Sequence, residues 1–443
     1  MSESGKAEFC SQWLDKMCLQ GFVDKHPNAL PHSLAFVYLF FSSRELAAYI
    51  FIILIASLSV PLMYFLAVLL FNNREIGYFS ALFMSLAPVH ILWSGSVSTE
   101  IYYVFLSLMV FIITLLYVQN KCTSLLVASA TLLSYTIQTR PESLFFSLII
   151  ILSLILFSKQ KNSLEIFDNL LLYALIFLLF STLHITHLNY TSKVDSWGAK
   201  GEKLSMDYLK RNLSPNIRFM IDPSRSFVIL IPLMLLSLIN FRSNFSEKFI
   251  LLVWMLAFFV IFLLFYAGSV EAGGTSSRFV VMWYPPLILL AAHAIAKINK
   301  FFSKYIDIKT LYVYWCVLIV LSFYPTLDFI RTVDPQADVG RIMRDMGIEM
   351  SQKLPDNCVV ITGTPSIFIV QGQNSMDFHN ALNKENLKSI YNKHKCVYFF
   401  EDYWCKYVKK SQCDAILTNN EHELVDTILV EKKWPLSFYE LHP

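Results

Sequence analysis

The segment Ser269–Ile298 reads SVEAGGTSSRFVVMWYPPLILLAAHAIAKI, and it decides the class of fold. A polar, glycine-containing loop leads through Arg278 into the apolar segment Phe279–Ala296. A helix needs about 20 mostly apolar residues to cross the hydrocarbon core of a bilayer, so this segment is a candidate membrane span. An arginine at such a boundary either anchors the helix among lipid headgroups or binds the phosphate of a ligand.

The composition is that of an integral membrane protein. Hydrophobic residues make up 55% of the 443-residue chain, charged residues make up only 16%, and the mean hydropathy is +0.50. The net charge of +3 is too small to indicate nucleic-acid binding. Eight cysteines in so long a chain do not indicate a disulfide scaffold, and their spacing does not indicate a structural zinc site. One disulfide is left open among the four cysteines of the tail, Cys358, Cys396, Cys405 and Cys413.

Ten mostly uncharged segments, separated by polar loops, are candidate membrane-spanning helices. A further apolar segment, Ala29–Phe41, is too short to span, and we expect it to form a helix that lies in the membrane interface. The ten candidates are Leu46–Phe71, Ile76–Trp93, Ile101–Val118, Thr123–Gln138, Ser143–Phe157, Leu170–Leu188, Phe227–Ile239, Phe249–Tyr266, Phe279–Ala296 and Leu311–Leu327.

The short loops between these segments predict the orientation, because cytoplasmic loops are enriched in Lys and Arg. One set of alternate loops contains ten basic residues, whereas the opposite loops GSVSTE, TRPE and GSVEAGGTSSR contain only Arg140 and Arg278. We therefore expect the first 45 residues, the loop 189–225 and the tail after Ile330 on the outer face. The ten basic residues of the expected cytoplasmic loops are Arg74, Lys121, Lys159, Lys161, Arg242, Lys248, Lys297, Lys300, Lys304 and Lys309.

The polar tail differs from the rest of the chain. The polar helix VGRIMRDMGIEMSQKL is followed by short strand-like runs such as CVVITG and CVYFFED, a pattern that predicts a small α/β domain. The expected fold is therefore an all-α polytopic membrane protein of about ten transmembrane helices with a small C-terminal α/β soluble domain. Its expected parts are an outer N-terminal loop with the interfacial helix (1–45), a transmembrane domain (46–330) and an extracytoplasmic α/β domain (331–443).

In this topology, polar residues from several outer loops converge at one membrane surface. Two arginines at helix boundaries, on a face that otherwise avoids positive charge, predict an anion-binding site, since the guanidinium matches a phosphate bidentately. The alternative is that both arginines anchor at phospholipid headgroups and pair with neighbouring carboxylates. The converging residues are Asp24, His26, Glu100, Arg140, Glu142, Glu271 and Arg278.

Three motifs resemble the GT-C superfamily, the membrane glycosyltransferases that use polyprenyl-phosphate sugars. FNNREIGYFSALFMSLAPVHILWSGSVSTE (Phe71–Glu100) looks like their second and third helices, with the charged hairpin, the SLAP break and an outer Glu. TSSRFVVMWYPPLILLAAHAI (Thr275–Ile295) resembles their Arg-aromatic segment before a proline-containing helix. DKHPNALP (Asp24–Pro31) is similar to the D-x-H-P-P motif of protein mannosyltransferases. Within the superfamily, the chain looks like the protein mannosyltransferases and aminoarabinose transferases.

The resemblance implies inverting transfer of a sugar from a polyprenyl-phosphate donor to an acceptor hydroxyl on the extracytoplasmic face. A carboxylate deprotonates the acceptor, and cationic groups stabilise the departing lipid phosphate. The implied partners are a lipid-linked sugar, an acceptor that is a glycan, a lipid or a protein, and the membrane, without nucleic acid. No cofactor is assigned, and a divalent metal is left open. By resemblance, the candidate catalytic carboxylates are Glu8, Asp24 and Glu100, and the candidate ligands of the donor phosphate are Arg278, Arg140 and His26.

The N-terminal residues depart from the family pattern. The families usually place an acidic pair and an aromatic about 19 residues before the D-x-H-P motif, but here Gly5 and Lys6 precede Phe9, and the nearest acids are Glu3 and Glu8. Residues 1–20 contain no export signal, so we expect a first helix to be encoded upstream of Met1. Two other functions remain open. One is a transporter or flippase of a lipid-linked or anionic solute, and the other is a catalytically inactive GT-C-like relative.

Overall fold

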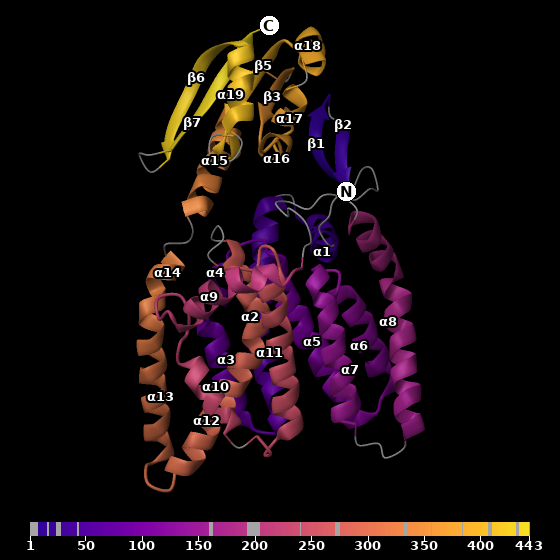
Figure 1. The fold of residues 1–443 in the computed structure, drawn as a ribbon, viewed down its shortest axis with the longest axis vertical. Helices are drawn as coiled ribbons and strands as arrows, with labels where there is room; N and C mark the ends of the chain where they lie inside the picture. The colour runs from indigo at the N-terminus through magenta and orange to yellow at the C-terminus, as the bar shows by residue number, and fades with distance from the viewer. Residues whose placement is uncertain are drawn as a thin grey trace. The chain divides into compact units, whose positions relative to one another are not determined.

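Contacts divide the chain into two compact units, a helical unit of residues 25–333 and a sheet unit of residues 1–24 and 334–443. Figure 1 shows the helices and strands of each unit. The computed structural model describes residues 8–15, 17–23, 28–41, 44–158, 163–192, 204–239, 241–270, 275–331, 335–355, 357–382, 384–405, 410–430 and 434–442.

The helical unit consists of α-helices joined by short loops and by 3-10 helices, which are labelled η. Its elements are α1 (Ala29–Tyr38), α2 (Arg44–Phe71), α3 (Arg74–Leu86), α4 (Pro88–Ser94), α5 (Thr99–Asn120), α6 (Thr123–Thr136), η1 (Pro141–Phe145), α7 (Phe146–Leu156), α8 (Ser163–Ser192), α9 (Asp207–Ile221), α10 (Leu230–Leu238), α11 (Phe245–Leu264), η2 (Thr275–Trp283), α12 (Tyr284–Phe302), α13 (Ile308–Phe323), η3 (Tyr324–Thr326) and α14 (Leu327–Arg331).

Each of the ten predicted spans coincides with helix, and the predicted polytopic helical fold is confirmed. Within the described residues, six helices are long and apolar enough to cross a membrane, and the bent pair α3 and α4 raises the number to seven. The pair is bent by 55° at Ala87, where the backbone is extended and Pro88 begins the new helix. Helices α6, α7 and α10 are shorter than a simple span, so the count of ten crossings stays a prediction.

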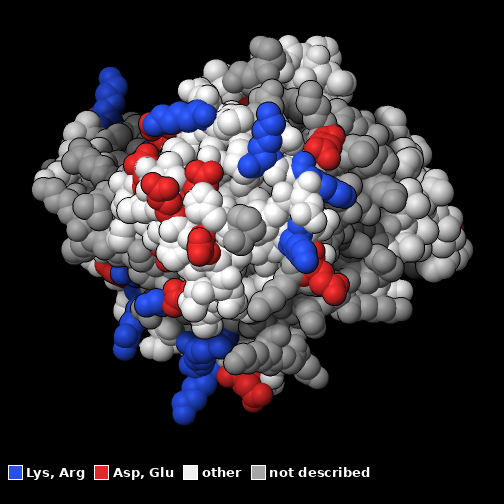
Figure 2. All heavy atoms as spheres, turned by 90° about the horizontal axis from the view of Figure 1, so that it is seen from above, with Lys and Arg blue, Asp and Glu red and all other residues white. Residues whose placement is uncertain are grey.

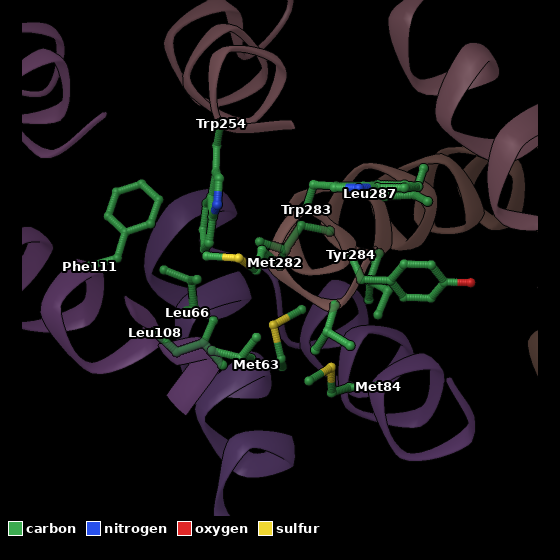
Figure 3. Packing of buried hydrophobic residues seen from close by; sticks show 14 of the residues in the cluster. Met63, Leu66, Met84, Leu108, Phe111, Trp254, Met282, Trp283, Tyr284 and Leu287 are labelled. Atoms are coloured by element: carbon green, nitrogen blue, oxygen red, sulfur yellow. The ribbon is translucent and has the colours of Figure 1, made fainter. Parts of the chain in front are cut away.

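The core of the helical unit surrounds α12. The span Ser277–Phe302 has a fully buried apolar window, whereas α8 and α13 are only 11% buried and face outward. The segment that follows Arg278 is therefore the central helix of the unit. Figure 3 shows how α2, α3, α5, α11, η2 and α12 pack together through Met63, Leu66, Met84, Leu108, Phe111, Trp254, Met282, Trp283, Tyr284 and Leu287.

Helix α1 lies within the segment Ala29–Phe41 that was expected to form an interfacial helix. The hydroxyl of Ser33 lies 2.6 Å from the hydroxyls of both Tyr102 and Tyr135, and these contacts hold α1 against α5 and α6. Phe36 on the helix and Phe40 just after its end are both exposed. The helix is confirmed, and its place in the membrane interface stays a prediction.

The sheet unit contains one seven-stranded sheet in the order β2-β1-β4-β3-β5-β7-β6. Strands β4, β3 and β5 are parallel, and the outer strands pair antiparallel. Its elements are β1 (Glu8–Leu14), β2 (Met17–Val23), α15 (Pro335–Lys353), β3 (Cys358–Thr362), α16 (Ser366–Ile369), β4 (Asn374–Asp377), α17 (Phe378–Ala381), α18 (Lys384–Lys393), β5 (Cys396–Glu401), α19 (Lys410–Asn419), β6 (Glu421–Val430) and β7 (Trp434–His442).

Side chains from the central strands point alternately to two cores. Val359, Ile361 and Phe399 pack with α18 and α19, whereas Val360 and Phe400 pack with α15 and α16. Because helices cover both faces, every residue of β3 is buried, as is typical of parallel strands. The predicted α/β tail is thereby confirmed. Figure 2 shows basic and acidic side chains interspersed over the face it displays, in agreement with the small net charge.

The N-terminal residues differ from the expectation of one outer loop over residues 1–45. Residues 8–23 form a hairpin, and β1 adds to the sheet through the pairs Gln12↔Met376 and Trp13↔Ser375. The amide N–H of Asp15 also donates to Asn374 Oδ1 at 2.9 Å. The hairpin extends a sheet edge more than 350 residues away in sequence, so no local pattern could reveal its partner.

Among the described residues, two disulfides cross-link the sheet unit. Cys358–Cys396 joins β3 to β5, and Cys405–Cys413 joins the residues after β5 to α19. The sequence left one bridge open among these four cysteines, and the structure pairs all four. The described free cysteines, Cys122 and Cys316, both belong to the helical unit.

Candidate active site

Four of the residues expected to converge lie together in the helical unit. Glu100 belongs to the first turn of α5, Arg140 and Glu142 to the turn between α6 and α7, and Arg278 to η2. The turn forms because Pro141 disfavours helical backbone at Arg140, which is extended. Three chain segments that are distant in sequence therefore meet at one cluster.

Glu100 is the centre of this cluster and is almost completely buried, with 1% of its side chain exposed. Its Oε2 accepts hydrogen bonds from Ser98 Oγ (3.0 Å) and Thr99 Oγ1 (3.2 Å). Its Oε1 contacts Arg140 Nη1 and lies 3.2 Å from Arg278 Nε. A buried carboxylate is tolerated only when it is paired and hydrogen-bonded, and both conditions hold here.

The guanidinium of Arg140 is paired with two carboxylates, Glu100 and Glu142. Its Nε and Nη2 donate to Glu142 at 3.0 and 3.3 Å, its Nη1 contacts Glu100, and only 11% of its side chain is exposed. Burial alone lowers the pKa of the guanidinium, but Glu142 and Glu100 outweigh burial and raise the pKa overall. Arg140 therefore stays charged, and its main bonding directions are already occupied.

Arg278 has a different environment. Its side chain is 40% exposed, and Glu100 is its only ion-pair partner among the described residues. The Nε atom lies at ion-pair distance from Glu100 but has no aligned acceptor. The Nε atom therefore lies beside the buried carboxylate, and the side chain as a whole remains partly exposed.

The ring of Phe279 joins the two arginines. The Cζ atom of Arg140 lies 4.6 Å from the ring centroid, and the Cζ atom of Arg278 lies 5.2 Å from it. Phe262 of α11 stacks on the same ring at 4.7 Å and 7°. Cations are attracted to aromatic rings at such distances, so the ring helps to hold two like charges close together.

Asp24, His26 and Glu271 lie outside the described residues. Glu8 is at the start of β1, in the sheet unit, and its side chain is also outside the description. Within the described part of the chain, no three His, Cys, Asp or Glu side chains form a group that could hold a metal ion, so the divalent metal stays open and no step is assigned to it.

Sequence reasoning missed the hydroxyls of Ser98 and Thr99. A signal for them existed, since Ser98 is the N-cap residue of α5 and Glu100 is in its first turn. Ser at the N-cap and Glu in the first turn are both favoured at helix starts. The motif STE is therefore a helix-start pattern, but the Ser98 hydroxyl donates to Glu100 and does not cap the backbone.

The comparisons with known proteins agree with this architecture. The sequence model of the family described as dolichyl-phosphate-mannose-protein mannosyltransferase matches residues 25–185. No curated protein sequence matches the chain significantly.

Two crystal structures share the fold. ArnT from Cupriavidus metallidurans in the apo state is 12% identical, with a TM-score of 0.62 over 94% of this chain and 87% of that chain. The apo oligosaccharyltransferase of Archaeoglobus fulgidus is 14% identical, with a TM-score of 0.57 over 91% of this chain. This chain spans 65% of the length of that enzyme. The partial family match and the shared fold agree that this integral membrane protein has the fold of the GT-C glycosyltransferases.

Proposed function

We propose that this protein is an inverting membrane glycosyltransferase that transfers a sugar from a polyprenyl-phosphate donor to an acceptor hydroxyl on the extracytoplasmic face. In this reaction the acceptor oxygen forms a bond to the anomeric carbon, and the bond between that carbon and the phosphate oxygen breaks. A carboxylate takes the proton of the acceptor, and the lipid phosphate leaves with the electron pair.

The observation that carries the proposal is the partly exposed side chain of Arg278 beside the buried Glu100. Glu100 and Phe279 hold its inner side at 3.2 and 5.2 Å, and its outer nitrogens have no ion-pair partner among the described residues. A planar fork that is fixed at one end and open at the other suits bidentate binding of a phosphate. Such a preorganised cation stabilises the negative charge that develops on a leaving phosphate.

The other cluster residues have supporting roles in this proposal. Arg140 is occupied by Glu142 and Glu100, so it positions Glu100 and adds positive potential behind Arg278. Glu100 holds the two arginines and is therefore a positioning residue, not the base. The role of the base stays with the acids implied by the family resemblance, Asp24 and Glu8.

Two independent features support an extracytoplasmic site. The basic residues of the short loops are concentrated on the opposite side of the membrane, which predicts that side to be cytoplasmic. The described part of the sheet unit contains two disulfides, and disulfides persist in oxidising compartments. An outer sheet unit satisfies both observations.

Cysteine accessibility in intact cells tests this orientation. We expect native Cys122, which is free and exposed beside Lys121, to react with a membrane-impermeant maleimide only after permeabilisation. A cysteine introduced by Lys300→Cys should behave in the same way, and one introduced by Lys388→Cys on α18 should react before permeabilisation. The introduced cysteines are placed in a Cys122→Ser, Cys316→Ser background. Labelling of Lys300→Cys from outside would contradict the orientation.

Binding and turnover of the donor test the function itself. The full-length protein in nanodiscs should bind a polyprenyl-phosphate sugar much more tightly than the matching polyprenol, because only the former offers a phosphate to Arg278. With a suitable acceptor, it should release free polyprenyl phosphate. Equal affinity for the phosphate and the alcohol, across a panel of sugars, would reject the proposed donor.

A further inference from the structure

Helix α9 buries two asparagines against the polypeptide that leads to Arg278. Asn212, Asn216 and Phe219 are spaced by four and three residues, so they share one face of the helix, and all three are buried. The opposite face exposes Leu213 and Ile217. Buried amides are costly unless their donors and acceptors are satisfied, and backbone groups between residues 262 and 270 satisfy both.

Asn212 caps the C-terminal end of α11. Its Nδ2 lies 3.3, 3.1 and 2.7 Å from the carbonyl oxygens of Phe262, Leu263 and Phe265. The last four carbonyls of a helix lack intrahelical partners, and this amide supplies one. Asn212 begins the sequon NLS, but its side chain is fully buried and engaged, so the amide is structural.

Asn216 makes two hydrogen bonds to the backbone that follows α11. Its Nδ2 donates to the carbonyl of Gly268 at 3.0 Å, and its Oδ1 accepts from the amide N–H of Val270 at 2.9 Å. One side chain therefore replaces the backbone partner that a neighbouring strand would provide. Gly268 is required here, because a Cβ atom at this position would lie 1.7 Å from the carbonyl oxygen of Phe262.

Phe262 connects α9 to the segment that carries Arg278. Its carbonyl is bound by Asn212, and its ring stacks on Phe279 at 4.7 Å. The guanidinium of Arg278 lies 5.2 Å from the ring of Phe279. Asn216 and Phe279 also line the same small cavity, together with Phe262 and Gly268. A continuous chain of contacts thus runs from the amides of α9 to the guanidinium.

We propose that Asn212 and Asn216 are positioning residues, through which α9 holds Phe262 and Phe279 and thereby keeps Arg278 in the geometry that binds the donor phosphate. This inference rests on the proposed function. The inference gives α9 a positioning role. The sequence predicted this stretch only as part of the loop 189–225, which connects two spans.

The test compares Asn216→Leu with wild type in the full-length protein in nanodiscs. The variant loses both hydrogen bonds, so backbone hydrogen exchange should become faster in residues 265–270 and also in residues 275–283. Affinity for a short-chain polyprenyl monophosphate should fall about two- to tenfold, the effect of one or two hydrogen bonds. Asn216→Asp keeps the acceptor for Val270 but places a carboxylate oxygen against the Gly268 carbonyl, so it should also speed exchange and lower affinity. Ser214→Ala, on the exposed face of α9, should change neither quantity.

A double variant separates positioning from general weakening. If Asn216 acts through Arg278, Asn216→Leu should have little further effect on binding in an Arg278→Ala background. Losses that multiply in the double variant, or unchanged exchange in residues 275–283, would overturn the inference. If wild type fails to bind the polyprenyl monophosphate, the proposed function fails, and the exchange measurement alone still decides whether α9 holds η2.

Discussion

Arg278→Ala is expected to weaken binding of a polyprenyl-phosphate sugar by about 10- to 150-fold, the effect of losing a charged hydrogen bond worth about 1.5–3 kcal/mol. The side chain is 40% exposed, and its removal leaves Glu100 paired with Arg140, Ser98 and Thr99. The loss should therefore appear in affinity and not in folding. Arg278→Lys keeps the charge but not the planar fork, so it should lie between wild type and the alanine variant.

Arg225→Ala is the matched control for this prediction. Arg225 is also predicted to be on the outer face, its side chain is 47% exposed, and it pairs with one carboxylate, Asp222. If the arginines acted only as membrane anchors or as general positive charge, replacing either one by Ala would change donor affinity to the same extent. We therefore expect the control to bind like wild type. Unchanged affinity in Arg278→Ala, measured on protein that elutes as wild type, would return the residue to the role of a headgroup anchor.

Glu100→Gln is expected to lower the stability of the helical unit strongly, by about 3–5 kcal/mol, because removing one partner of a buried ion pair leaves uncompensated charge. The substitution preserves the shape of the side chain but leaves Arg140 and Arg278 facing each other without their shared carboxylate. Thermal unfolding in detergent measures the effect as a lower midpoint, and the yield of monodisperse protein should fall with it.

Glu142→Gln provides a graded comparison within the same cluster. Glu142 also pairs with Arg140, but that arginine would keep its contact with Glu100, so the loss should be smaller. Glu349→Gln on α15, an exposed i,i+4 pair with Lys353, should hardly shift the midpoint. An unfolding midpoint for Glu100→Gln equal to that of wild type would show that the buried carboxylate does not hold the cluster together.

The membrane-spanning architecture was predictable because the signal for each span is local. A run of apolar residues is recognisable without knowledge of its neighbours, and the predicted segment Leu46–Phe71 closely matches α2. The break between α3 and α4 was likewise visible in SLAP, since proline begins a helix and disfavours helical backbone just before it. Lengths were less predictable, because α10 covers only nine residues, Leu230–Leu238, of the longer predicted segment Phe227–Ile239.

The membership of the cluster was also within reach of the sequence. Loop charge asymmetry singled out Arg140 and Arg278, and the topology brought Glu100 to the same face. The contacts among these residues were not predictable. Both arginines have the same chemistry and lie at similar boundaries, yet one is enclosed by two carboxylates and the other is half open. The packing of α5, η1 and η2 against each other decides which of the two guanidinium groups is enclosed by carboxylates.

By itself the sequence determined the class of protein, the helical segments, the α/β tail and four of the residues that meet in the cluster, because hydropathy, periodicity and loop charge are properties of short stretches. Tertiary structure decided three things that depend on contacts between distant stretches. It joined the N-terminal hairpin to β4, it turned the sequon asparagine at Asn212 into a cap of α11, and it left Arg278 accessible beside a buried Glu100. Each outcome is set by which backbone or charged group is nearest in space, and that proximity exists only once the chain has folded.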